Sequence, residues 1–207
     1  MRTIFLLLAA ALSIGSNMAA LAAAGPDSNS AAVVGTVTVS GHPTSDVVIS
    51  LVGIPPGSEK KTHAAADQQQ VTMAQRDQKF SPYVLPVMVG TTVEFPNDDK
   101  VWHNIYSDSK VKKFDLGLYG PGKSKTVTFD TPGVVRILCN VHPTMEAYIV
   151  VEDHLNFAST DARGNYRFEG ILLGSYHLQV WHPSLGVKTE SFTLERAGEV
   201  ERIDVNL

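Results

Sequence analysis

Short runs in which apolar and polar residues alternate recur along most of the chain, separated by Gly, Pro, Asn and Asp. A period of two is the spacing of a β-strand that buries one face. After the N-terminal segment no long run shows the period of an amphipathic helix. The pattern therefore predicts an all-β protein built from sandwiches or barrels. The clearest runs are VVGTVTVS, DVVISLVG, GTTVEFPND, KSKTVTFDTPG, EAYIVV, GSYHLQVW and EVERIDVNL.

The N-terminal segment has the pattern of a secretory signal. Arg2 precedes an apolar run that is about 10 to 12 residues long, too short to span a membrane. Small residues then end in two A-x-A patterns, at Ala20 to Ala22 and at Ala22 to Ala24. We therefore expect a cleaved signal over residues 1–24 and a periplasmic protein. No cysteine directly follows the signal, so we expect no lipid-linked membrane anchor.

The charge of the chain excludes two classes of partner. Its formal net charge is −4, and losing Arg2 with the signal makes it more negative. The chain has no block of basic residues. We therefore expect neither nucleic acid nor an anionic membrane surface among its partners.

Breaks in composition divide the rest of the chain into three parts. Residues 55–70 are polar, rich in Ala, Gln and Lys, and lack alternation, so we interpret them as a linker. After VVEDHLNF the aliphatic strands give way to hairpins with Gly-Asn and Gly-Ser turns. We expect a central domain at residues 71–152, with flanking parts at residues 31–54 and 153–207.

The central part holds the only cysteine of the protein. In RILCNVHPTMEAYIVV, Cys139 lies three residues before His142, which lies three residues before Met145. His103 follows an earlier strand, in FPNDDKVWHNIYS. Copper that cycles between two oxidation states favours two imidazoles and a thiolate in a trigonal set, with a weak thioether on the axis. Two loops at one end of a sandwich could bring these four side chains to one ion.

Each of these residues also has a structural interpretation. Met145 could fill the core, His103 could be a loop residue, and His142 could simply precede Pro143 in a turn. A lone cysteine in an exported protein could be an inert buried thiol or form an intermolecular disulfide. Their combination favours a metal site. The other histidines match no zinc or copper spacing and are expected at the surface: His42, His63, His154, His177 and His182.

The central part resembles the cupredoxins, the small blue copper proteins. VGTTVEFPND, the HN pair at His103 and TPGVVRILC are similar to strand and ligand segments of plastocyanins and amicyanins, and CNVHPTM has the amicyanin-type loop spacing. The resemblance implies a Greek-key sandwich or barrel that holds one type 1 copper ion. It implies His103, Cys139 and His142 as equatorial ligands, Met145 as the axial ligand, and Asn104 as a tie between the ligand loops. Val135 departs from the aromatic residue usual in plastocyanins.

The flanking parts resemble a second family. VVGTVTVSGHPTSDVVISLVG is similar to the first strands of a carboxypeptidase regulatory-like, transthyretin-type β-sandwich, and TDARGNYRFEGILLGSYHLQVWHP to its remainder. The resemblance implies a hairpin turn from Asp161 to Asn165, in which Gly164 supplies a positive φ angle. Neither flank alone has enough strands to bury a core, whereas the two joined do. The order of the parts along the chain, a half sandwich, a cupredoxin and a second half sandwich, is similar to that of bacterial proteins labelled methylamine utilization or plastocyanin-like. That label describes the genome neighbours of some members.

The resemblance to cupredoxins implies a type 1 copper protein that carries single electrons between a redox protein donor and acceptor. From the signal pattern we expect it in the periplasm, and we expect a monomer. We expect electrons to pass through the imidazole edge of His142, beside an apolar docking face. The residues expected on that face are Val141, Pro143, Leu116, Leu118 and Tyr119.

Two other functions remain open. The same ligands would suit a copper carrier or storage protein. A noncatalytic adhesion or glycan-binding sandwich with a degenerate metal site is the third hypothesis. The sequence has no nucleophilic serine motif and no glycine-rich phosphate loop, so we do not expect an enzyme.

Overall fold

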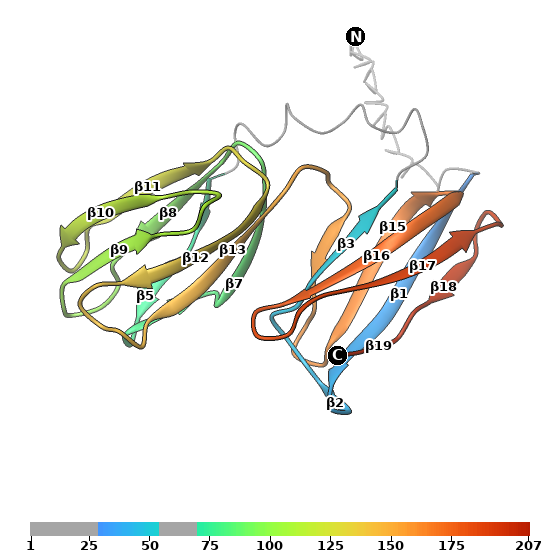
Figure 1. Cartoon of the computed structure of the whole chain (residues 1–207), viewed down its shortest axis with the longest axis horizontal. Coiled ribbons are helices and arrows are strands. Elements are labelled where there is room, and N and C mark those ends of the chain that lie inside the picture. Colours follow the sequence, from blue (N-terminus) through green and yellow to red (C-terminus); the bar gives the residue numbers. More distant parts are fainter. Residues whose placement is uncertain (1–28, 54–69) are drawn as a thin grey trace, which may run out of the picture.

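The computed structural model describes residues 29–53 and 70–207. The expected signal at residues 1–24 and the linker at residues 55–70, apart from Gln70, lie outside the described residues. Strands, turns and loops make up the described part of the chain, which confirms the all-β prediction. That part contains no helix that could cross a membrane. Figure 1 shows two β-sandwiches side by side.

The central sandwich packs two sheets on one core. One sheet has the order β10-β9-β12-β13-β7 and the other has the order β11-β8-β4, with β5 and β6 forming a separate hairpin. Two strand pairs, β13 with β7 and β4 with β8, are parallel, and the other pairs are antiparallel. The strands are β4 (Gln70–Thr72), β5 (Ala74–Arg76), β6 (Lys79–Ser81), β7 (Val84–Met88), β8 (Thr91–Pro96), β9 (His103–Ser107), β10 (Phe114–Tyr119), β11 (Ser124–Phe129), β12 (Gly133–Cys139) and β13 (Glu146–Glu152).

Side chains alternate between the core and the surface along β12, and this alternation points the Cys139 side chain toward the core. Val135, Ile137 and Cys139 are buried, whereas Arg136 between them is exposed. These buried side chains join one core cluster with residues of β8 such as Phe95. Cys139 is thus the last member of a core-facing row, at the point where the strand ends.

The second sandwich is built from both flanks of the chain. One sheet has β1 at its centre, paired with β15, β18, β19 and β2, and the other has the order β14-β3-β16-β17. Strands before and after the central sandwich therefore share both sheets and one core. The strands are β1 (Ser30–Val39), β2 (His42–Pro43), β3 (Val48–Val52), β14 (Phe157–Ser159), β15 (Asn165–Leu172), β16 (Gly174–His182), β17 (Gly186–Leu194), β18 (Val200–Arg202) and β19 (Val205–Asn206).

The turn before β15 has the predicted positive φ angle at Gly164, but the prediction of a hairpin is wrong, because β14 pairs with β3 and β15 with β1 in the other sheet. Gly164 has φ 74°, and its N–H donates to the carbonyl oxygen of Asp161 at 2.9 Å. A Cβ atom at this position would lie 2.4 Å from the carbonyl oxygen of Val37. Both the backbone angle and the space therefore require glycine.

A small interface joins the two sandwiches. Val48 of β3 packs with Val84 and Val150 of the central sandwich. Beside them, the rings of Tyr148 and Trp181 meet edge to face with centroids 5.5 Å apart. These apolar contacts fix β3 and β16 against β7 and β13.

Candidate metal centre

The sheet brings the two ligand segments together. His103 begins β9 and Cys139 ends β12, and these strands pair antiparallel with Cys139 opposite Ile105. The chain then turns through a short loop in which the N–H of Met145 donates to the carbonyl oxygen of His142 at 2.9 Å. That turn places His142 over the same end of the sandwich.

Three potential ligand atoms form a compact triangle. The Sγ atom of Cys139 lies 3.7 Å from Nδ1 of His103 and 3.9 Å from Nδ1 of His142, and the two Nδ1 atoms are 3.1 Å apart. A point equidistant from the three atoms lies about 2.1 Å from each, close to typical metal–imidazole and metal–thiolate distances. The donor set therefore fits a trigonally bound transition metal.

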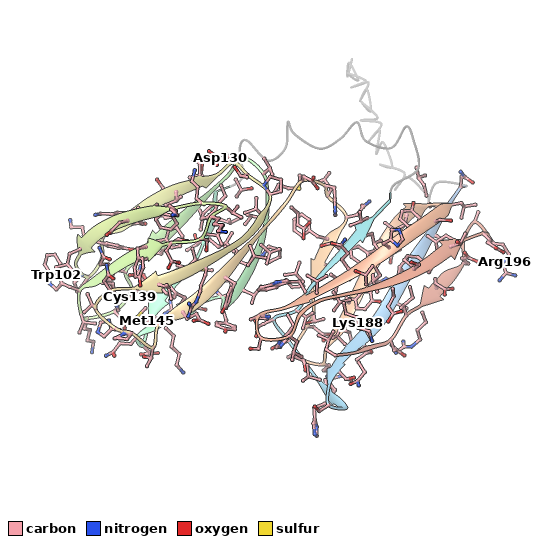
Figure 2. All side chains as sticks on the ribbon, in the orientation of Figure 1. Trp102, Asp130, Cys139, Met145, Lys188 and Arg196 are labelled. Atoms are coloured by element: carbon pink, nitrogen blue, oxygen red, sulfur yellow. The ribbon has the colours of Figure 1, made fainter. Side chains whose placement is uncertain are left out.

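Burial around the triangle is uneven. His103 is fully buried and Cys139 is 4% exposed, whereas His142 is half-buried. Met145 is buried in the same core cluster as Cys139. In Figure 2 these two sulfur-containing residues lie at the end of the central sandwich that also carries Trp102. The site is thus closed on the core side, and His142 is its edge toward the surface.

Asn104 ties the two ligand segments together, as the resemblance implies. Its Oδ1 accepts a hydrogen bond from Nδ2 of Asn140 at 2.8 Å, and its carbonyl oxygen accepts one from the Asn140 N–H. Asp115, which sequence reasoning missed, accepts from Nδ2 of Asn104 at 2.7 Å. Hydrogen bonds from the N–H of Gly117 and from Asn104 lower the pKa of Asp115. The carboxylate therefore fixes which way the Asn104 amide points.

Asp99 is a second residue that sequence reasoning missed. Its Oδ2 lies 2.8 Å from Nε2 of His103. Because Nδ1 faces the triangle, Nε2 carries the proton and donates to the carboxylate. The N–H groups of Asp77 and Gln78 also donate to Asp99 at 2.7 and 2.9 Å. Burial raises the pKa of Asp99, but hydrogen bonds from Gln78, His103 and Asp77 outweigh it and lower the pKa.

An Asp99→Asn variant is expected to bind copper about 10- to 100-fold more weakly, the usual range for removing a carboxylate behind a ligand histidine. The amide can no longer supply the charge that orients the His103 ring and increases its basicity. Competition with a chromogenic chelator measures the affinity. The matched control is Asp98→Asn, because the exposed Asp98 side chain pairs with Arg76 and is not a partner of the ligand His103. Equal weakening by both variants would contradict a specific role for Asp99.

The expected docking face needs two corrections, the first being Leu116, which is partly buried and packs against the core of the central sandwich. Val141 and Leu118 are 44% and 57% exposed, and Pro143 is exposed too. Tyr119, in contrast, is buried, and its hydroxyl donates to the carbonyl oxygen of Phe95 at 2.9 Å. A bulge in the β9–β10 pairing between Asp115 and Leu118 shifts the alternation. Leu118 consequently points outward and Tyr119 inward.

Two exposed apolar residues beside His103 were missed. Trp102 is 57% exposed and Val101 is 38% exposed. The indole ring of Trp102 lies over Gly120, where an added Cβ atom would approach it to 3.0 Å. The glycine thus lets a large aromatic ring lie flat at the end of the site.

The remaining histidines do not gather into a second metal site in the described part of the chain. His42 and His177 are exposed, as expected. His154 and His182 are half-buried, so they lie at the surface less fully than His42 and His177 do. His63 lies outside the described residues.

A family model described as a cupredoxin-like domain matches residues 49–151. This match begins within β3, a strand that belongs to the second sandwich. A comparison with curated proteins finds no match.

Several solved structures are similar to this chain. A copper-containing nitrite reductase from Thermus scotoductus SA-01 is 32% identical with a TM-score of 0.40; the similarity covers 42% of this chain and 23% of that protein. A purple cupredoxin from Nitrosopumilus maritimus is 26% identical with a TM-score of 0.37, covering 40% of this chain and 99% of that one. A Cu(I) form of a mutant amicyanin is 20% identical with a TM-score of 0.38, covering 50% and 98%. Together with the all-β fold, the family match at residues 49–151 shows that this chain contains a cupredoxin-like domain.

Proposed function

We propose that the protein is a periplasmic type 1 copper protein that carries single electrons between a redox protein donor and acceptor. The observation that carries this proposal is the triangle of His103 Nδ1, Cys139 Sγ and His142 Nδ1. These residues would hold one copper ion, with Met145 as a weak axial ligand. Copper in such a set supplies one-electron oxidation and reduction.

The chain holds the ligand side chains in place on rigid elements. His103 is fixed through Asp99 on one side, and Asn104 links the two ligand segments on the other. Cys139 is fixed by its place at the end of a central strand of the sheet. Ligands that cannot rearrange suit electron transfer, because a geometry that changes little between oxidation states needs little reorganisation.

The surface around His142 suits brief contacts with a redox partner. The half-buried imidazole lies in the same loop as exposed Val141 and Pro143, and Trp102 directly precedes the ligand His103. Transient electron-transfer complexes use small interfaces. We propose that this apolar end is the docking face, with electrons passing through the edge of His142.

The location, the partners and the second sandwich belong to the same proposal. The signal pattern at residues 1–24 supports export to the periplasm, and the absence of a basic block supports protein partners rather than nucleic acid. The split sandwich would be a noncatalytic, carboxypeptidase regulatory-like domain that accompanies the copper domain in a monomer.

Spectroscopy and redox cycling of the copper-loaded chain test the proposal. An electron carrier should show an intense visible band that bleaches on reduction and returns on oxidation, over many cycles, with the copper retained. Rapid loss of copper to a competing acceptor in either oxidation state would instead support a copper carrier or storage protein. Binding of zinc alone, with no visible band, would overturn the proposal.

A Met145→Gln variant is expected to keep copper and to lower its reduction potential. The thioether is a weak axial ligand that tunes the potential more than it holds the metal, and an amide oxygen favours the oxidised state. Voltammetry measures the change. Met88→Leu is the matched control, since Met88 is also buried but lies opposite Glu152, at the far end of the sheet. Complete loss of copper from Met145→Gln alone would contradict the axial assignment.

A further inference from the structure

A groove lies where the two sandwiches meet, away from the metal centre. It has a volume of about 220 Å³, below the usual range of about 300–1,000 Å³ for drug-sized ligands. Its walls come from the start of β12 and the end of β13 on one side and from β3, β16 and β17 on the other. In the β12–β13 register these ends meet at Gly133 and Val151, whereas Cys139 ends β12 at the opposite end. The groove is lined by Ser50, Pro132, Gly133, Val134, Val150, Val151, Glu152, Asp153, Gln179, Trp181 and Val187.

The charged side chains that line the groove are all acidic. Its lining residues include two carboxylates, Glu152 and Asp153, and no lysine, arginine or histidine. Asp153 is exposed and forms no ion pair with the described residues. The side chain of Glu152 is only 14% exposed, so its charge is largely removed from water. A carboxylate in this position favours a cationic partner.

Of the two carboxylate oxygens of Glu152, one is hydrogen-bonded and the other is held only by a long contact with His154. Oε1 accepts from the hydroxyl of Ser50 at 2.6 Å. Oε2 lies 3.7 Å from Nε2 of His154, which is an ion pair when that imidazole is protonated but is too long for a hydrogen bond. Nδ1 of His154 is itself buried without a hydrogen-bond partner among the described residues. Oε2 therefore accepts no hydrogen bond from the described residues, and the Glu152 carboxylate lines the groove.

The walls of the groove suit the apolar part of such a partner. Trp181 lines the groove, and packing against Tyr148 at an interplanar angle of 62° holds its ring in place. A cation over an indole ring gains attraction from the ring's electrons. Val134 and Val187 add aliphatic surface, and Gln179 adds an amide that can accept a hydrogen bond.

We propose that this groove binds a small organic cation, an ammonium or guanidinium group on a short alkyl chain. Its head lies against Glu152, its chain runs along Trp181 and Val187, and the groove volume limits the ligand to a few carbons. The site is separate from the metal centre and does not depend on copper.

Calorimetric titration of the full chain with butylammonium, butylguanidinium and neutral 1-pentanol tests the proposal. We expect at least one cation to bind about tenfold or more tightly than the alcohol, and the tighter of the two cations identifies the preferred head group. Glu152→Gln keeps an acceptor for Ser50 but removes the charge, so it should weaken binding about tenfold. Trp181→Phe should weaken it as well. Glu169→Gln is the control, because Glu169 is an exposed carboxylate outside the groove. This variant should bind the cations as tightly as the wild type does.

Equal affinity for the alcohol and the cations would overturn the proposal, as would a Glu152→Gln variant that binds as tightly as the wild type. Absence of heat with both cations at high concentration would overturn it too. If Glu152→Gln does not fold, the comparison of charged and neutral ligands on the wild-type chain still decides. Copper loading and the visible spectrum are not used, so this test can fail while the proposed electron carrier stands.

Discussion

A Cys139→Ser variant is expected to lose the intense visible band of the copper-loaded protein completely while keeping its fold. The band requires a thiolate that donates charge to the metal, and a serine hydroxyl stays protonated at neutral pH. Cys139 is almost fully buried and ends β12, so a smaller side chain leaves the strand pairing intact. A buried hydroxyl costs about 1–3 kcal/mol of stability. Absorption spectra and thermal unfolding followed by circular dichroism separate the two effects.

The matched control for this substitution is Thr144→Ser in the same loop. Thr144 is exposed and offers no ligand to the triangle. This variant should keep the band. A serine variant at position 139 that still shows the band would mean that the thiol is not a ligand. A band lost together with the cooperative unfolding transition would mean that Cys139 acts mainly through packing.

Side chains close to the ligands in sequence could be predicted, because their chemistry and spacing are local. The alternation of β12 already places Cys139 on the core face, and its spacing to His142 is a property of one loop. Asp99 could not be predicted in this way. Its carboxylate is held by the N–H groups of Asp77 and Gln78, which lie in a hairpin that precedes it by more than 20 residues. Nothing in the local sequence shows that this hairpin reaches the ligand loop.

The wrong placement of Tyr119 has a different cause. Neighbouring residues of a strand point to opposite faces, so Leu118 and Tyr119 cannot both lie on the docking face, and a bulge changes which of them points outward. The register of β10 shifts between Asp115 and Leu118, where Gly117 has φ 66°. A glycine in a strand pattern signals a bulge, and this signal was present in the sequence.

The interface between the sandwiches also lies beyond local patterns. Tyr148 on β13 and Trp181 on β16 project away from the core of their own sandwich, as polar residues usually do. Only the approach of the two sandwiches buries these rings against each other. The groove beside them depends on that approach as well, so neither follows from periodicity.

The isolated C-terminal flank, residues 155–207, is expected to show no cooperative unfolding transition. β1 lies at the centre of one sheet, and β3 pairs with both β14 and β16 in the other. Without these strands the remaining ones lose partners in both sheets, and the core loses fully buried side chains such as Val33, Ile49 and Leu51. Unpaired strand edges and a solvent-exposed apolar sheet face favour aggregation.

Two further fragments complete this test. Residues 30–57 joined to residues 154–207 by a short Gly-Ser linker contain all the strands of the second sandwich and should unfold cooperatively. Residues 66–153 contain the complete core of the central sandwich and all four proposed ligands, so they should fold and bind copper. Their melting temperature should lie below that of the full chain, because the contacts of Val84 and Val150 with Val48 are lost.

Circular dichroism melts of the three fragments decide between two architectures. In a split sandwich, cooperativity is absent from the tail alone and returns when the first flank is supplied, since each sheet needs strands from both flanks. In an architecture of two separate elements, the tail would melt cooperatively by itself and gain nothing from the first flank. The pairing of β1 with β15 over most of its length and of β3 with β16 favours the first outcome. All four proposed ligands lie in the inserted domain, so copper binding in the full chain should raise the melting temperature of that domain more than that of the split one.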